Sequence, residues 1–78
     1  MDTLGEKRVR TAFNPGNNDT VQNLKEKFAH LINQVDDIKS YKVPGEGPTT
    51  DPEKLRLIDL SQQRLEEGAM YAVKAATM

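Results

Sequence analysis

The sequence predicts an all-α protein that folds as an antiparallel helical hairpin, with one domain covering residues 1–78. Two segments, 19–39 and 51–76, carry apolar residues at alternating spacings of three and four, which is the period of an amphipathic helix. The segment between them, 40–50, is rich in proline and glycine and predicts a loop. A chain of 78 residues has room for one domain at most.

Residues 1–18 predict an irregular N-terminal segment, because they are polar and end in a Pro-Gly-Asn-Asn turn. Arg8 and Arg10 belong to a small basic cluster, which serves either surface solubility or phosphate contact. Phe13 precedes the turn and lies on neither helical stripe, so it is either a lid on the first helix or a stacking surface for a flat ligand. Asn14 either caps the turn or hydrogen-bonds a base edge.

The helix expected at 19–39 has a heptad-like apolar stripe and a well-marked start. Asn18 or Asp19 can accept hydrogen bonds as the N-cap, and Lys39 in the last turn suits the helix dipole. The stripe consists of Val21, Leu24, Phe28, Leu31, Val35 and Ile38, with Ile32 widening it.

The helix expected at 51–76 starts either with a Thr50…Glu53 capping box or with Asp51 as N-cap before Pro52. Its stripe contains one polar residue, Gln62, which either sets the register of an oligomer core or lines a central pocket. Small residues gather at its end, and the apolar surface there extends most of the way round. We therefore expect other copies of the chain to pack against this end: Gly68, Ala69, Ala72, Ala75 and Ala76.

The composition limits what the chain can be. Only 17 of its residues are Leu, Ile, Val or Phe, close to the level of roughly 20% below which chains tend to be disordered. Oligomerisation is the expected source of additional stability, because there is no cysteine for a disulfide or zinc-thiolate site. A single histidine, His30, predicts neither a metal site nor an enzyme. The net charge of −1 argues against a DNA or RNA polymer as partner, and the absence of a long apolar run argues against a membrane.

Three segments resemble the phage anti-CBASS cyclic-oligonucleotide sponge family, whose hairpin domain is shared with anti-Thoeris sponges. The stretch from Leu60 to Thr77 resembles that family's C-terminal helix, and the stretch from Leu24 to Ile38 resembles its first long helix. Phe13-Asn14-Pro15 resembles a motif seen in members of the group. Together these segments comprise 36 of the 78 residues.

The resemblance implies a non-enzymatic protein that forms compact homohexamers and sequesters the cyclic nucleotides of bacterial defence. Its ligands would be cyclic dinucleotides such as cyclic GMP-AMP and, at a second site, cyclic trinucleotides, with no cofactor and no metal. The expected compartment is the cytoplasm of the infected bacterial host. The alternative function is a small helical adaptor that binds another protein through the alanine-rich helix.

The resemblance also implies which residues contact the ligands. Phe13 and Lys25 correspond to the family's aromatic residue and lysine at the dinucleotide site, with Asn14 beside them and Arg8 and Arg10 within reach. Phe13 stands where the family more usually has tyrosine, so one hydroxyl contact is missing. The trinucleotide site would come from the second helix, at Gln62, Gln63 and Arg64.

Overall fold

The fold is described by a computed structural model, which covers residues 2–40 and 50–78. Its elements in chain order are α1 (Leu4–Val9), α2 (Asp19–Asp37), the 3₁₀ turn η1 (Ile38–Ser40) and α3 (Pro52–Ala76). The described residues contain no strand, so the all-α class is confirmed. The expected loop falls almost entirely on residues 41–49, which lie outside the described residues.

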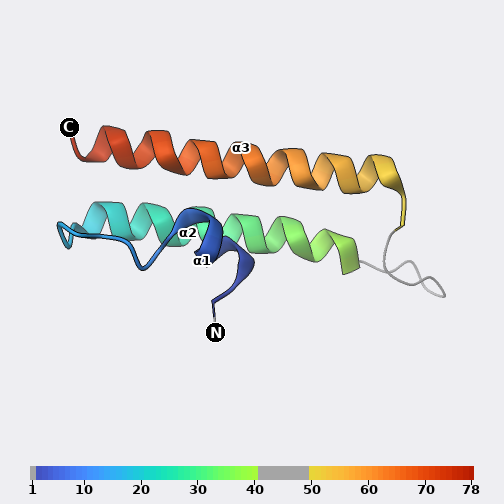
Figure 1. Ribbon diagram of the computed structural model, residues 1–78, viewed down its shortest axis with the longest axis horizontal. Helices are drawn as coiled ribbons and strands as arrows, with labels where there is room; N and C mark the ends of the chain where they lie inside the picture. Colours follow the sequence, from blue (N-terminus) through green and yellow to red (C-terminus); the bar gives the residue numbers. More distant parts are fainter. Residues whose placement is uncertain (1, 41–49) are drawn as a thin grey trace.

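The two long helices run antiparallel along the length of the molecule, and α1 packs on α2 (Figure 1). The principal extents are 48 × 23 × 14 Å. The two long helices lie side by side and only the short helix α1 is packed over α2, so the core is thin.

Both long helices begin at residues with capping side chains. The Asn18 side-chain oxygen accepts from the Val21 amide at 3.1 Å, so Asn18 rather than Asp19 is the N-cap of α2. Asp51 caps α3 by accepting from the Glu53 amide at 3.0 Å, with proline at the first helical position. Of the two predicted starts for α3, the structure therefore adopts the Asp-Pro start.

Helix α1 contradicts the prediction that residues 1–18 are irregular. A reciprocal capping box starts it: the Thr3 hydroxyl accepts from the Glu6 amide at 3.2 Å, and the Thr3 amide donates to the Glu6 carboxylate at 3.0 Å. Six residues are too few for a helix to persist by propensity alone. Packing on α2 stabilises it, and the Thr-x-x-Glu spacing was the only local sign of it in the sequence.

Gly5 permits the close packing of α1 on α2. A Cβ atom at this position would lie 1.9 Å from the Ala29 carbonyl oxygen, so no larger residue fits. The Gly5 amide instead donates to the Asn33 side-chain oxygen at 2.8 Å, and the Asn33 amide group donates to the Thr3 hydroxyl at 3.0 Å. The first turn of α1 is thus fixed to the middle of α2.

The buried face of α2 differs from the predicted stripe. The four buried side chains of α2 are Val21, Lys25, Ala29 and Ile32, whereas Leu31, a predicted core residue, is 44% exposed. The physical reason is that both α1 and α3 pack on α2. The most buried residues of α2 therefore lie along the strip of helix surface between these two contacts. The main core cluster consists of Val9, Ala29, Ile32 and Ala69, with Leu4, Phe28 and Leu65 partly buried around it.

The alanine-rich end of α3 is only partly covered within one chain. Ala69 is buried, whereas Met70 and Tyr71 are 69% and 73% exposed. Among residues 2–40 and 50–78, no helix has both the length and the apolarity required to cross a membrane.

Candidate functional site

A groove between the N-terminal segment and the second half of α3 brings together four of the five residues predicted for the dinucleotide site. Its volume is about 350 Å³. The N-terminal segment and α2 supply three cations and an aromatic ring to it, and α3 supplies the opposite wall. The lining residues are Arg8, Val9, Arg10, Phe13, Lys25, Glu66, Ala69, Met70 and Val73.

Phe13 presents an aromatic ring at the mouth of this groove, with its side chain and backbone together 53% exposed. The Arg10 guanidinium lies over the ring, 4.5 Å from its centroid, and the Lys25 ammonium is 5.4 Å from it. Both distances are within the range of cation–π attraction. The arrangement combines a flat hydrocarbon face with positive charge, which suits a ligand that is both aromatic and anionic.

Arg10 is placed there by the end of α1. It is the C-cap residue and adopts the left-handed conformation, with φ 60°, while its amide donates to the Glu6 carbonyl at 2.9 Å. This conformation turns the chain sharply after α1. The next turn of backbone then brings Phe13 back, and its amide donates to the Arg10 carbonyl at 2.9 Å.

Lys25 is buried, although it was expected to act near the start of α2. It lies in the second turn, where only 6% of its surface is exposed. Its ammonium nitrogen donates to the Arg10 carbonyl at 3.1 Å and to the Phe13 carbonyl. Desolvation by burial, followed by the charge of Arg10, lowers the pKa of Lys25 below its ordinary value. Since an ammonium carries three N–H donors, one remains for another acceptor.

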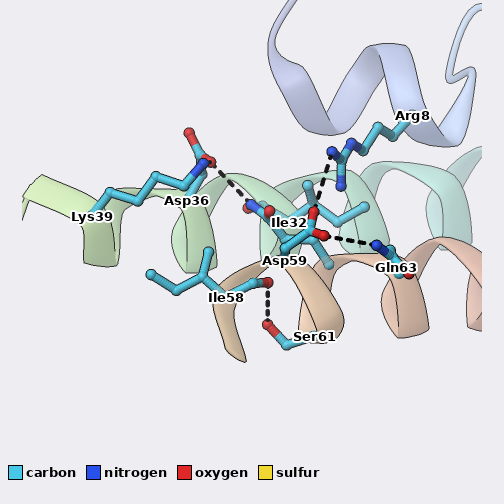
Figure 2. A network of polar contacts seen from close by, with 9 residues as sticks. Arg8, Ile32, Asp36, Lys39, Ile58, Asp59, Ser61 and Gln63 are labelled. Atoms are coloured by element: carbon cyan, nitrogen blue, oxygen red, sulfur yellow. Dashed lines mark hydrogen bonds and ion pairs between the residues drawn. The ribbon is translucent and has the colours of Figure 1, made fainter. Parts of the chain in front are cut away.

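Arg8 extends from α1 toward α3, where its nearest acid is Asp59 (Figure 2). The separation between Nη2 of Arg8 and Oδ1 of Asp59 is 4.0 Å, too long for a hydrogen bond. The other terminal nitrogen, Nη1, is buried without a hydrogen-bond partner. A buried guanidinium N–H without an acceptor is costly, and in this arrangement the guanidinium is directed at Asp59 with Nη1 closed to solvent.

Asn14 is used within the turn. Its amide nitrogen donates to the Asn18 carbonyl at 2.9 Å and to the Gln22 side chain at 3.3 Å, while its oxygen accepts from the Asn18 amide at 3.1 Å. Of its two predicted roles, capping the turn is therefore the one the structure displays. Asn14 orients the segment that enters α2 and does not line the groove.

The three residues predicted for a trinucleotide site do not converge within one chain. Gln62 is 1% exposed and points toward α2, where its amide nitrogen donates to the Ile32 carbonyl at 3.2 Å and to the Asp36 carboxylate at 3.1 Å. Gln63 is exposed and donates to Asp59 at 2.8 Å (Figure 2). Arg64 is also exposed and pairs with Glu67 at 3.0 Å.

The wall contributed by α3 was missed at the level of sequence. Glu66, Met70 and Val73 are spaced by four and three, so they share one helical face, and that spacing was the available signal. Glu66 places one carboxylate in a groove that holds three cations. The groove therefore keeps a net positive charge and is suited to an anion.

Within the described ranges there is no cluster of three or more histidine, cysteine or carboxylate side chains able to hold a metal ion. Comparisons with models of protein families, with curated proteins and with solved structures find no match to this chain. The groove and its chemistry are therefore the basis for assigning a function.

Proposed function

We propose that the chain is a binding protein that sequesters a cyclic dinucleotide in the groove lined by Arg8, Arg10, Phe13 and Lys25. The observation that carries the proposal is the Phe13 ring, half exposed, with the Arg10 guanidinium 4.5 Å from its centroid. A nucleobase is a flat aromatic group that stacks on such a ring, and its phosphate is an anion that pairs with arginine. The resemblance to cyclic-oligonucleotide sponges supports the same ligand class.

The size of the groove favours a ligand shared between copies of the chain. At about 350 Å³ it lies near the lower limit of roughly 300–1,000 Å³ for small-molecule sites. We infer that one groove takes one nucleotide of the cyclic ligand and that a second subunit takes the other. This inference accords with the thin fold and with the hexameric assembly implied by the resemblance.

The proposed role is sequestration in the cytoplasm of an infected bacterial host, with the ligand released chemically unchanged. Native mass spectrometry with a panel of cyclic di- and trinucleotides tests it, because ligand identity and subunit number are measured together. Cyclic GMP-AMP should bind and be recovered intact after the protein is denatured. Recovery of a linear product would contradict the proposal and indicate a phosphodiesterase.

Phe13→Ala tests the stacking surface. Base–aromatic stacking contributes about 1–3 kcal/mol, so the dissociation constant for cyclic GMP-AMP should rise about 5- to 150-fold. Leu57→Ala is the matched control, because Leu57 is also an exposed apolar residue, at 54% against 53%, but does not line the groove. Equal affinity of the Phe13 and Leu57 variants would refute the assignment of this ring.

The alternative function is an adaptor that binds another protein through the end of α3. The exposure of Met70 and Tyr71, at 69% and 73%, favours it, because such side chains are common in protein interfaces. Ala72→Arg distinguishes the two functions. If the end of α3 joins copies of this chain, the variant should form a smaller species in light scattering. If it binds a different protein, the variant should keep its assembly state and lose only that protein.

A further inference from the structure

The buried ammonium of Lys25 joins the two ends of the turn that displays the proposed ligand contacts. It donates to the carbonyls of Arg10 and Phe13, and the Phe13 amide closes the same turn onto Arg10 at 2.9 Å. This cation thus helps to hold the ring and the guanidinium above it in position. We call residues 2–18, which carry both groups, the arm.

The arm has a second point of attachment to α2. The Gly5 amide donates to the Asn33 side chain at 2.8 Å, and the space beside Gly5 is filled by the Ala29 backbone. Gly5 and Lys25 therefore hold the arm on either side of Arg8. A six-residue helix is marginal in water without such contacts, so an arm released from α2 is expected to lose α1 as well.

Burying a charged amine is costly unless its hydrogen bonds compensate for the lost hydration. Lys25 is 6% exposed, and two of its three donors are occupied by arm carbonyls. These carbonyls belong to the residue that caps α1 and to the residue that carries the ring. In the unliganded fold, most of the hydrogen bonding of the ammonium therefore holds the arm against α2.

We propose that Lys25 is a positioning residue, which promotes ligand binding by holding the Phe13 ring and the Arg10 guanidinium at the groove. This inference rests on the proposed function, and it differs from a direct lysine–phosphate contact. If only the docked arm binds ligand, the observed dissociation constant equals the intrinsic one divided by the docked fraction. The measured affinity must then be proportional to the fraction of molecules in which the arm is docked.

The test compares Lys25→Met with Lys27→Met in the full chain. Lys27 is the matched control because it is an exposed cation on α2 that does not line the groove. Two quantities are measured: hydrogen-exchange protection of the Phe13 amide without ligand, and affinity for cyclic GMP-AMP. In Lys25→Met the ratio of docked to released arm, which the protection reports, should fall about tenfold or more, as expected for the loss of charge-assisted hydrogen bonds. The affinity should fall by the factor by which the docked fraction falls. Lys27→Met should change neither.

Two further variants separate positioning from general destabilisation. Lys25→Arg keeps N–H donors for the two carbonyls and should restore most of the Phe13 protection. Gly5→Ala changes no charge but places a methyl group against the Ala29 carbonyl, so it should reproduce the paired losses. Far-UV circular dichroism checks that α2 and α3 remain helical in each variant.

The outcomes that overturn the proposal are distinct. Reduced affinity in Lys25→Met with unchanged Phe13 protection would show a direct contact between Lys25 and the ligand. An unchanged affinity in a variant whose arm is mostly released, with the Phe13 amide almost unprotected, would show that the arm does not position the ligand. If the wild-type chain does not bind any cyclic nucleotide, the proposed function fails together with the positioning role.

Discussion

Replacing Gln62 with alanine should remove much of the stability of the isolated chain. The Gln62 amide donates to the Ile32 carbonyl at 3.2 Å and to the Asp36 carboxylate at 3.1 Å, and the side chain is 1% exposed. A neutral hydrogen bond contributes about 1 kcal/mol. The bond to the carboxylate contributes about 1.5 kcal/mol, at the low end because the Asp36 side chain is 36% exposed. Lost packing adds about 0.8 kcal/mol for the buried methylene.

The expected cost of Gln62→Ala is therefore about 3 kcal/mol, compared with a total of about 3–5 kcal/mol for a core of this size. Urea unfolding followed by far-UV circular dichroism at pH 7, at one fixed protein concentration, measures it. Gln62→Leu is the matched control, because leucine fills the volume and loses the two hydrogen bonds, about 2.5 kcal/mol, while burial of its apolar side chain recovers part of that cost. A cost below about 1 kcal/mol for Gln62→Ala, with an unchanged denaturant slope, would refute this reasoning.

Acid provides a second test of the same contact. Hydrogen bonds from Lys39 and then from Gln62 lower the pKa of Asp36 below its ordinary value of 3.8. A carboxyl group whose pKa is lowered in the fold stabilises it above the ordinary value, and that stabilisation disappears as the pH falls through the lowered value. The difference in unfolding free energy between wild type and Gln62→Leu should therefore shrink as the pH falls below about 3.8. A constant difference would exclude Asp36 as the relevant acceptor.

Three further predictions concern stability. Asp51→Ala removes the side-chain oxygen that accepts from the Glu53 amide at the start of α3, so the free energy of unfolding in urea should fall by about 1 kcal/mol. An unchanged free energy of unfolding would show that this cap does not stabilise α3. Gly68→Ala should stabilise the chain by up to about 1 kcal/mol, because the new Cβ meets only the edge of the Phe28 ring at 3.3 Å; destabilisation would show that the ring cannot move. Burial lowers the pKa of Lys25 from 10.5, so the unfolded chain binds more protons in the window just below that value. Wild type should therefore gain stability relative to Lys25→Met as the pH rises through that window. A difference in unfolding free energy between the two proteins that does not change with pH would contradict this.

Part of the candidate site could be predicted from sequence because its residue types suit the ligand chemistry. Phe13, Arg8 and Arg10 were singled out as an aromatic residue and nearby cations, the resemblance added Lys25, and all four line one groove in the structure. Glu66 and the rest of the α3 wall were missed, because their position beside the arm depends on a contact between segments more than fifty residues apart.

The hydrogen-bond partners of the polar side chains could not be predicted from the sequence either. Asn14 bonds to its own turn and Gln62 bonds to α2, although both were also candidates for ligand contact. A polar side chain forms the hydrogen bonds that its surroundings allow, and those surroundings arise only when the helices pack. Lys25 illustrates this most clearly, since its acceptors are backbone carbonyls 12 and 15 residues earlier in the chain.

The sequence by itself determined the all-helical class and the starts of both long helices. These features depend on local chemistry: the apolar spacing, an asparagine or aspartate that accepts backbone N–H bonds, and a proline at the first helical position. Only the tertiary structure decided that residues 4–9 form a helix, that Leu31 is exposed and that Lys25 is buried. The physical reason is that α1 is too short to exist alone, and its docking at Gly5 changes which face of α2 meets water.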